Sequence, residues 1–102
     1  MGLKPRAGAR ITVRNVNVPG YESTVDAAKN TEMKRVLLKV LPKKGGLTQS
    51  EMMSSVKAHL SAELFPGGKT SGWWVKCVQL DLEARGGMSR DASAKPLRWV
   101  KR

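Results

Sequence analysis

Apolar residues recur at helical spacing in three separate parts of the chain. The first part has them at the positions of an amphipathic helix, at Met33, Val36, Leu37, Val40 and Leu41. Ser23 and Asp26 precede them at the spacing of a capping box, although Asp is shorter than the usual Glu. We therefore predict a helix from about Val25 to Leu41 that ends at Pro42.

Two start signals coincide at the second helical part. Thr48 and Glu51 form a T-x-x-E capping box, and Leu47 stands where it can pack on Met52 as a hydrophobic staple. The predicted second helix has its buried stripe at Met52, Met53, Val56 and Leu60.

A third helix is predicted after the loop that ends at Thr70. Thr70 or Ser71 can cap this helix, and the glycines at 86 and 87 end it near Arg85. On a helical wheel it has two apolar faces, one with Trp74, Val75, Val78 and Leu82, the other with Trp73, Cys77, Leu80 and Ala84. Its clear polar face consists of Lys76, Gln79 and Glu83.

The two ends of the chain read as strands. Apolar and polar residues alternate imperfectly from Arg10 to Val18, with a change of phase near Arg14, and a turn follows at residues 19–20. At the other end, 88–90 and 97–101 predict a hairpin around the loop 91–96. We expect its inward-facing residues to be Met88, Leu97 and Trp99.

The order of helix, helix, loop, helix and basic hairpin resembles the winged helix-turn-helix fold. The residues that carry the resemblance are LTQSEMM, WWVKCVQLDLEARGG and MSRDASAKPLRWVKR, and the match covers Val25 to Lys101. The resemblance implies that Leu82, four residues before Gly86, packs the third helix and that Met88 opens the wing. The usual strand between the first two helices is not evident, so ITVRNVNV takes its place or adds a separate edge to the sheet.

The predicted fold is therefore α+β, with a three-helix winged helix-turn-helix-like core, a C-terminal β-hairpin wing and an N-terminal strand. It forms a single domain over residues 1–102, of which 1–9 are a flexible basic arm. The stretch FPGGKTSGWWVKCVQLDLEARG, together with PLRW, is also similar to a family of small bacterial proteins of unknown function. That similarity implies no activity.

A formal net charge of +11 adds a candidate partner to this picture, because it attracts polyanions such as nucleic acid. The charge lies in residues 1–44 and 85–102, whereas 45–84 carry three basic and four acidic residues. A winged helix normally places its third helix in the major groove, but this one is nearly neutral. Phosphate contacts from the wing and the arm, which includes Lys4 and Arg6, therefore fit better than base readout.

The candidate nucleic-acid-binding residues are Arg10, Arg14, Lys69, Lys76, Gln79, Arg90, Lys95, Arg98 and Lys101. We predict that they bind double-stranded DNA, although a solvated basic surface explains the charge equally well. The alternative function is a protein-interaction module or homodimer that uses the stripe of Trp73, Cys77 and Leu80. The N-terminal strand can also cover this stripe, and we expect that it does.

Catalytic and metal-binding patterns find little support in the sequence. GGKT, residues 67–70, lacks the first glycine and the preceding strand of a phosphate-binding loop. The single histidine, His59, has no second ligand at metal spacing, and the single Cys77 can form neither an intramolecular disulfide nor a thiolate zinc site. Asp81 is expected to pair with Arg85. We predict no enzymatic activity, no cofactor, no metal and no membrane span, and a cytoplasmic location.

Overall fold

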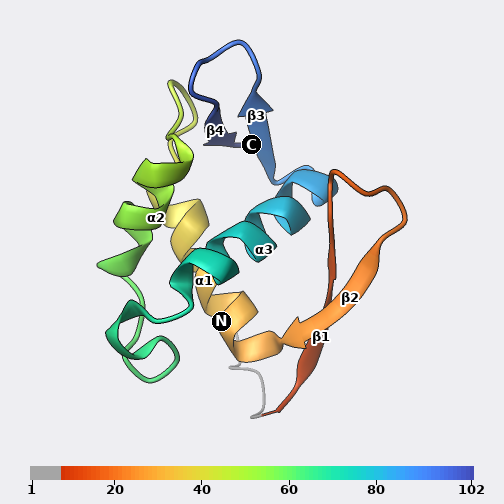
Figure 1. Cartoon of the computed structure of the whole chain (residues 1–102), viewed down its shortest axis with the longest axis vertical. Helices are drawn as coiled ribbons and strands as arrows, with labels where there is room; N and C mark the ends of the chain where they lie inside the picture. Colours follow the sequence, from red (N-terminus) through yellow and green to blue (C-terminus); the bar gives the residue numbers. More distant parts are fainter. Residues whose placement is uncertain (1–7) are drawn as a thin grey trace.

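In the computed structural model, which describes residues 8–102, three helices and two antiparallel hairpins surround a single apolar core (Figure 1). The elements in order are β1 (Arg10–Arg14), β2 (Glu22–Asp26), α1 (Ala27–Val40), α2 (Gln49–Lys57), a short 3-10 turn (Pro66–Gly68), α3 (Ser71–Arg85), β3 (Met88–Asp91) and β4 (Arg98–Lys101). The predicted α+β class, N-terminal strand and C-terminal hairpin are confirmed.

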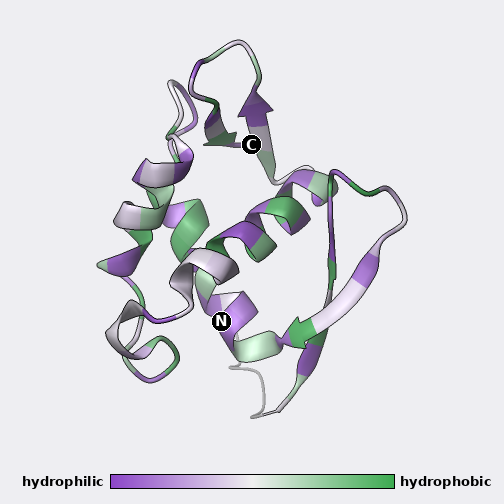
Figure 2. Cartoon of the chain, viewed as in Figure 1, coloured by the Kyte–Doolittle hydropathy of each residue, from purple (hydrophilic) through white to green (hydrophobic). Residues whose placement is uncertain are grey.

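The central element is α3, which lies between the other two helices and the N-terminal hairpin (Figure 1). Of its two predicted apolar faces, the one with Trp74, Val75, Val78 and Leu82 faces the core, because all four residues are buried. Hydrophobic and hydrophilic residues follow one another along every helix in Figure 2. The buried apolar ones from α1 and α2, including Met33, Leu37 and Met52, pack with those of α3.

The N-terminal region differs from the prediction, because a second strand precedes the first helix. In β2, Val25 pairs with Ile11 and Ser23 pairs with Val13 of β1. The predicted capping box and the helix start at Val25 are therefore wrong, and Asp26 alone caps α1 by accepting a hydrogen bond from the Lys29 N–H at 2.9 Å. The predicted strand also ends at Arg14, where its alternation changes phase.

The second helix begins as predicted. The Thr48 side chain accepts from the Glu51 N–H, and the Glu51 carboxylate accepts from the Thr48 N–H, so both halves of the capping box are present. The expected stripe is confirmed at Met52 and Val56, which are buried, while Met53 and Leu60 are partly buried against the core.

The C-terminal hairpin packs its base on the core and joins a residue that lies between α1 and α2. Met88 and Trp99 are buried as predicted, but Leu97 precedes β4 in the loop and is 37% exposed. Leu47 and Trp99 exchange backbone hydrogen bonds of 2.9 and 2.8 Å. Gly46, with φ of +75°, makes the close approach possible, since a Cβ there would lie 2.9 Å from the Trp99 carbonyl oxygen. Leu47 therefore adds a single paired residue to the C-terminal hairpin, next to β4.

Candidate nucleic-acid interface

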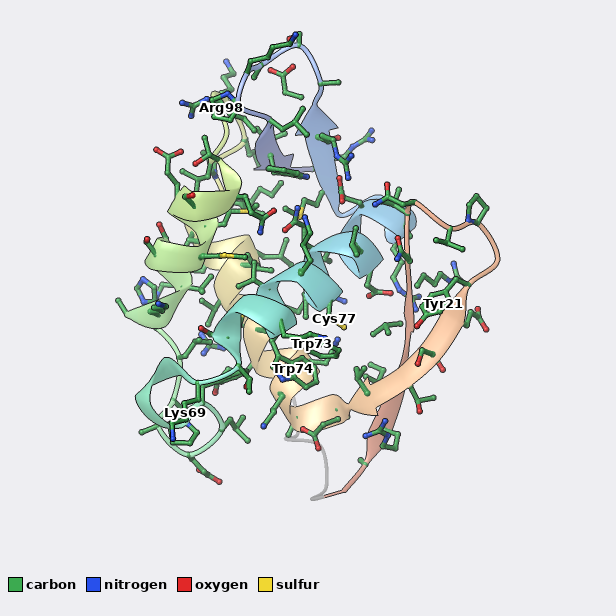
Figure 3. The ribbon with its side chains drawn as sticks, viewed as in Figure 1. Tyr21, Lys69, Trp73, Trp74, Cys77 and Arg98 are labelled. Atoms are coloured by element: carbon green, nitrogen blue, oxygen red, sulfur yellow. The ribbon has the colours of Figure 1, made fainter. Side chains whose placement is uncertain are left out.

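The nine predicted nucleic-acid-binding residues do not form one surface. Lys69 and Arg98 lie at opposite ends of the molecule (Figure 3), and Arg10 and Arg14 belong to the separate N-terminal hairpin. The remaining exposed candidate on α3 is Lys76, whose ammonium donates to the Gln49 side chain at 3.2 Å. A duplex cannot contact all of these positions at once. Residues 1–7, with Lys4 and Arg6 of the predicted arm, lie outside the described residues.

The predicted polar face of α3 is largely wrong. Gln79 is fully buried, and among residues 8–102 neither its amide oxygen nor its amide nitrogen has a hydrogen-bond partner. Glu83 keeps only 5% of its side chain exposed. The reason is that helices and hairpins pack around most of α3, so a position that is polar on the wheel need not face solvent. Gln79 is therefore removed from the candidate base-reading residues.

Replacing Gln79 with methionine is expected to raise the free energy of unfolding by about 1–2 kcal/mol. The change removes a buried amide that lacks partners and keeps an unbranched side chain of similar length. Urea unfolding followed by tryptophan fluorescence measures the effect. Gln79→Glu serves as the matched control and is expected to lower stability, because it places a charge at the same buried position. Loss of stability in Gln79→Met would contradict the assignment of an unsatisfied amide.

Glu83 attaches the C-terminal hairpin to α3. Its carboxylate accepts a hydrogen bond from the buried Trp99 indole N–H at 2.9 Å and two from the Arg90 guanidinium at 3.2 and 3.3 Å. The cations of Arg90 and Lys76 also stand 5.6 and 5.9 Å from the centre of the Trp99 ring. Arg90, a predicted phosphate contact, therefore has a nearly buried carboxylate as its partner within the protein.

Asp81 attaches the N-terminal hairpin to the same helix. Its Oδ1 accepts from the Arg14 backbone N–H at 2.7 Å and from the Arg85 guanidinium at 2.9 Å, and Arg85 also donates to the Thr12 carbonyl oxygen. The predicted pairing of Asp81 with Arg85 is confirmed. Asp81 is only 5% exposed, so this pair orders the hairpin as well as the helix.

Arginines and lysines differ in whether they form ion pairs within the protein. The described part of the chain has four ion pairs, and their cations are Arg14, Arg85, Arg90 and Arg98. No lysine within residues 8–102 belongs to an ion pair. The positive charge that remains uncompensated is therefore carried mainly by lysines.

Six cations converge where the α1–α2 loop meets the C-terminal hairpin. We call this surface the basic end; it consists of Lys43, Lys44, Lys95, Arg98, Lys101 and Arg102. Arg98 donates to the Gly46 carbonyl oxygen and the Lys101 ammonium donates to that of Leu38, both at 3.1 Å. Figure 1 shows the two loops side by side at the same end of the molecule.

Three of these six residues, Arg102 and the two loop lysines Lys43 and Lys44, were not among the nine candidate residues, and the two lysines lie outside every predicted binding segment. Their signal in the sequence is the run KKGG after the first helix. Nothing local indicates that this run lies beside a hairpin about fifty residues later in the chain. The contact depends on the pairing of Leu47 with Trp99.

The surroundings of Cys77 keep its thiol protonated. Burial raises the pKa of the Cys77 thiol, and the nearby Asp81 carboxylate raises that pKa further, so the thiol is neutral at physiological pH. Within 8–102 no three His, Cys, Asp or Glu residues gather as metal ligands would. Thr70 occupies the cap position of α3 without a side-chain cap, because its hydroxyl donates to the Lys69 carbonyl oxygen.

The apolar stripe on α3 is only partly covered. The N-terminal hairpin lies beside Cys77 and Leu80, which are half-buried, but Trp73 remains 59% exposed. The expectation that the N-terminal strand covers the stripe therefore holds for part of it.

In residues 8–102 we also find no helix with the length and apolar character that a bilayer crossing requires.

Comparison with known proteins places most of the chain in a family. A model of a family of unknown function, DUF6958, matches residues 10–99, from β1 to Trp99. No curated protein and no solved structure matches the chain significantly. Since the matched region includes all three helices, the whole N-terminal hairpin and the C-terminal hairpin except the last two residues of β4, the chain belongs to this family of unknown function, DUF6958.

Proposed function

We propose that the chain is a winged-helix-like module that binds double-stranded nucleic acid through phosphate contacts of the basic end. The observation that carries the proposal is the convergence of six cations from two segments distant in sequence. Phosphate contacts by lysine and arginine supply most of the affinity of sequence-independent binding, because each one releases condensed counterions from the duplex.

The winged-helix assignment is supported by the residue between the first two helices. In that fold a short strand at this place joins the wing, and here Leu47 pairs with Trp99 of β4. The helix order and the hairpin directly after α3 agree with the same arrangement. The N-terminal hairpin is then an addition to the fold that lies along α3.

The charges of the basic end are available to an external anion. The Lys101 ammonium binds a neutral carbonyl group, and Lys43, Lys44 and Lys95 are exposed and outside the four ion pairs. Only Arg98 shares its charge, with Glu51 at 3.5 Å. On α3, by contrast, Gln79 is buried and Glu83 is occupied by Trp99. The proposed binding is therefore mainly independent of base sequence.

The test is a titration of fluorescently labelled random duplex DNA, followed by anisotropy at several salt concentrations. We expect the triple variant Lys43→Gln, Lys44→Gln, Lys95→Gln to bind about tenfold or more weakly at near-physiological salt. The dependence of log K on log salt is expected to become shallower, because each lost phosphate contact removes about 0.9 from the slope.

A matched variant separates the basic end from net charge alone. Lys34→Gln, Lys57→Gln and Lys69→Gln remove the same charge from exposed positions elsewhere on the molecule. We expect this control to bind nearly as tightly as the unaltered protein. Equal weakening of the two variants, or no duplex binding even at low salt, would contradict the proposal.

A further inference from the structure

A small groove separates the N-terminal hairpin from α3. Its apolar lining comes from Val13, Tyr21 and Val25 on the hairpin and from Trp73, Cys77 and Leu80 on α3, and we call it the hairpin groove. Figure 3 shows Tyr21 on one side of it and Trp73 and Cys77 on the other. Its volume is about 220 Å³, below the roughly 300–1,000 Å³ of small-molecule pockets. The groove therefore suits one bulky side chain better than a cofactor.

Trp73 is packed against a neighbouring ring and yet exposed to solvent. Its ring lies edge-on against that of Trp74, with centroids 5.0 Å apart, yet more than half of the residue is exposed. Tyr21, across the groove, is also exposed. Fixed, partly exposed aromatic side chains that border an apolar pocket are typical of the positions that dominate binding energy in protein interfaces.

The surroundings of the groove are positively charged. A second depression begins on the far side of Trp73 and is lined by Arg10 and Lys29, while Lys76 borders the hairpin groove itself. Each of these cations has a neutral partner: the Thr24 carbonyl oxygen for Arg10, the Phe65 ring for Lys29 and the Gln49 amide for Lys76.

The two carboxylates nearby are already engaged within the protein. Asp26 caps α1, and Glu22 pairs with Arg14 at 3.5 Å. Asp26 keeps its negative charge as a helix cap and lines the second depression, so one carboxylate balances only part of the charge of the three cations, and a net positive charge remains beside Trp73. An acidic ligand complements it.

We propose that the hairpin groove docks an acidic segment of another protein. A bulky apolar side chain of that segment inserts between Tyr21 and Trp73, and Asp or Glu residues close to it in sequence contact Arg10, Lys29 and Lys76. The hairpin groove and the basic end share no residue, so an experiment that contradicts one proposal leaves the other unaffected.

Charge excludes two other occupants. A second copy of the chain that docks through this same surface would bring the same three cations against one another, which costs free energy at an interface. Residues 1–7 carry Lys4 and Arg6 and no carboxylate, so they do not complement the groove either. Single-stranded nucleic acid is the competing polyanion, since its bases stack on exposed aromatic side chains, and tight binding of labelled single-stranded DNA that Trp73→Ala abolishes would overturn the proposal.

The experiment is a selection of random peptides displayed on phage against the immobilised full chain. We expect the enriched peptides to combine one bulky apolar residue with Asp or Glu within a few positions. Synthetic fluorescein-labelled versions are then titrated by anisotropy, with two controls: the same peptide with alanine at the apolar position and the same peptide with Gln in place of each acid. Each control peptide is expected to bind about tenfold or more weakly.

Two variants of the protein test whether the peptide binds at the hairpin groove. Trp73→Ala and the exposed-position change Lys76→Glu are each expected to weaken peptide binding by about tenfold, whereas the basic-end variant Lys43→Gln, Lys44→Gln, Lys95→Gln leaves it unchanged. Lys76→Glu keeps the test valid if Trp73→Ala disturbs packing on Trp74. Selection of basic peptides, binding unaffected by both variants, or self-association that Trp73→Ala abolishes would overturn the proposal.

Discussion

Replacing Glu83 with alanine is expected to lower the free energy of unfolding by about 3 kcal/mol. The change leaves the buried Trp99 indole N–H without an acceptor and Arg90 without its carboxylate. Most of this loss arises at the indole, because a buried donor without an acceptor costs its full desolvation, whereas the Arg90 side chain is 31% exposed and water solvates part of it. Urea unfolding measures the loss, and the fluorescence of Trp99 is expected to shift to longer wavelength in the native state as the hairpin loosens.

Two further variants show whether the loss arises at Trp99. Glu63→Ala removes an exposed carboxylate from the same protein and is expected to change stability by less than about 0.5 kcal/mol. In a double-mutant cycle with Trp99→Phe, which lacks the indole N–H, we expect a coupling energy of about 1–2 kcal/mol with Glu83→Ala. Additive effects would mean that the hydrogen bond between Glu83 and Trp99 contributes little.

The Asp81→Ala variant is expected to lose about 2–3 kcal/mol and to release the N-terminal hairpin from α3. We place this below the Glu83 effect, because the groups that lose their partner, the Arg14 N–H and the Arg85 guanidinium, belong to exposed residues, whereas the Trp99 indole is buried. Hydrogen exchange locates the effect: the amide of Arg14, which donates to Asp81, is expected to lose its protection, together with that of Val16, which donates to the Leu80 carbonyl oxygen.

Glu22→Gln is the control for the hairpin. It breaks the ion pair with Arg14, in which both side chains are at least half exposed, and is expected to cost less than about 0.5 kcal/mol. Asp81→Asn keeps an acceptor for the Arg14 N–H and is expected to give an intermediate loss. Unchanged protection of Arg14 in Asp81→Ala would contradict the role of Asp81 as the attachment of the hairpin.

Features that depend on neighbours along the chain could be predicted from the sequence. The capping box of Thr48 with Glu51 and the pair of Asp81 with Arg85 follow from spacings of three and four residues on a helix. The helical wheel also gave the two apolar faces of α3, but only the structure shows that the face with Trp74 and Leu82 is the buried one while Trp73 is exposed. The helix start at residue 27 could not be placed, because ESTVD contains a single buried apolar residue and becomes a strand only through pairing with β1.

The candidate surfaces were less predictable, because they arise from contacts between distant segments. The helical wheel treats a polar position as a solvent-facing one, and Gln79 shows that this fails for a helix surrounded by packed elements. Likewise, residue counts give the charge of each segment but not its ion pairs, so Arg90 was predicted to be free although Glu83 holds it. Tyr21, which completes the hairpin groove, gave no signal of its own in the sequence.

The attachment of the N-terminal hairpin to Asp81 has a consequence for the synthesis of the chain. Asp81 follows Arg14 by 67 residues, and at a translation rate of roughly 5–20 residues per second it is made roughly 3–13 s later. An isolated two-stranded hairpin is at best marginally stable in water. The N-terminal hairpin therefore leaves the ribosome before the helix that secures it, and Val13 and Val25 stay open to chaperones or to other nascent chains until α3 has formed.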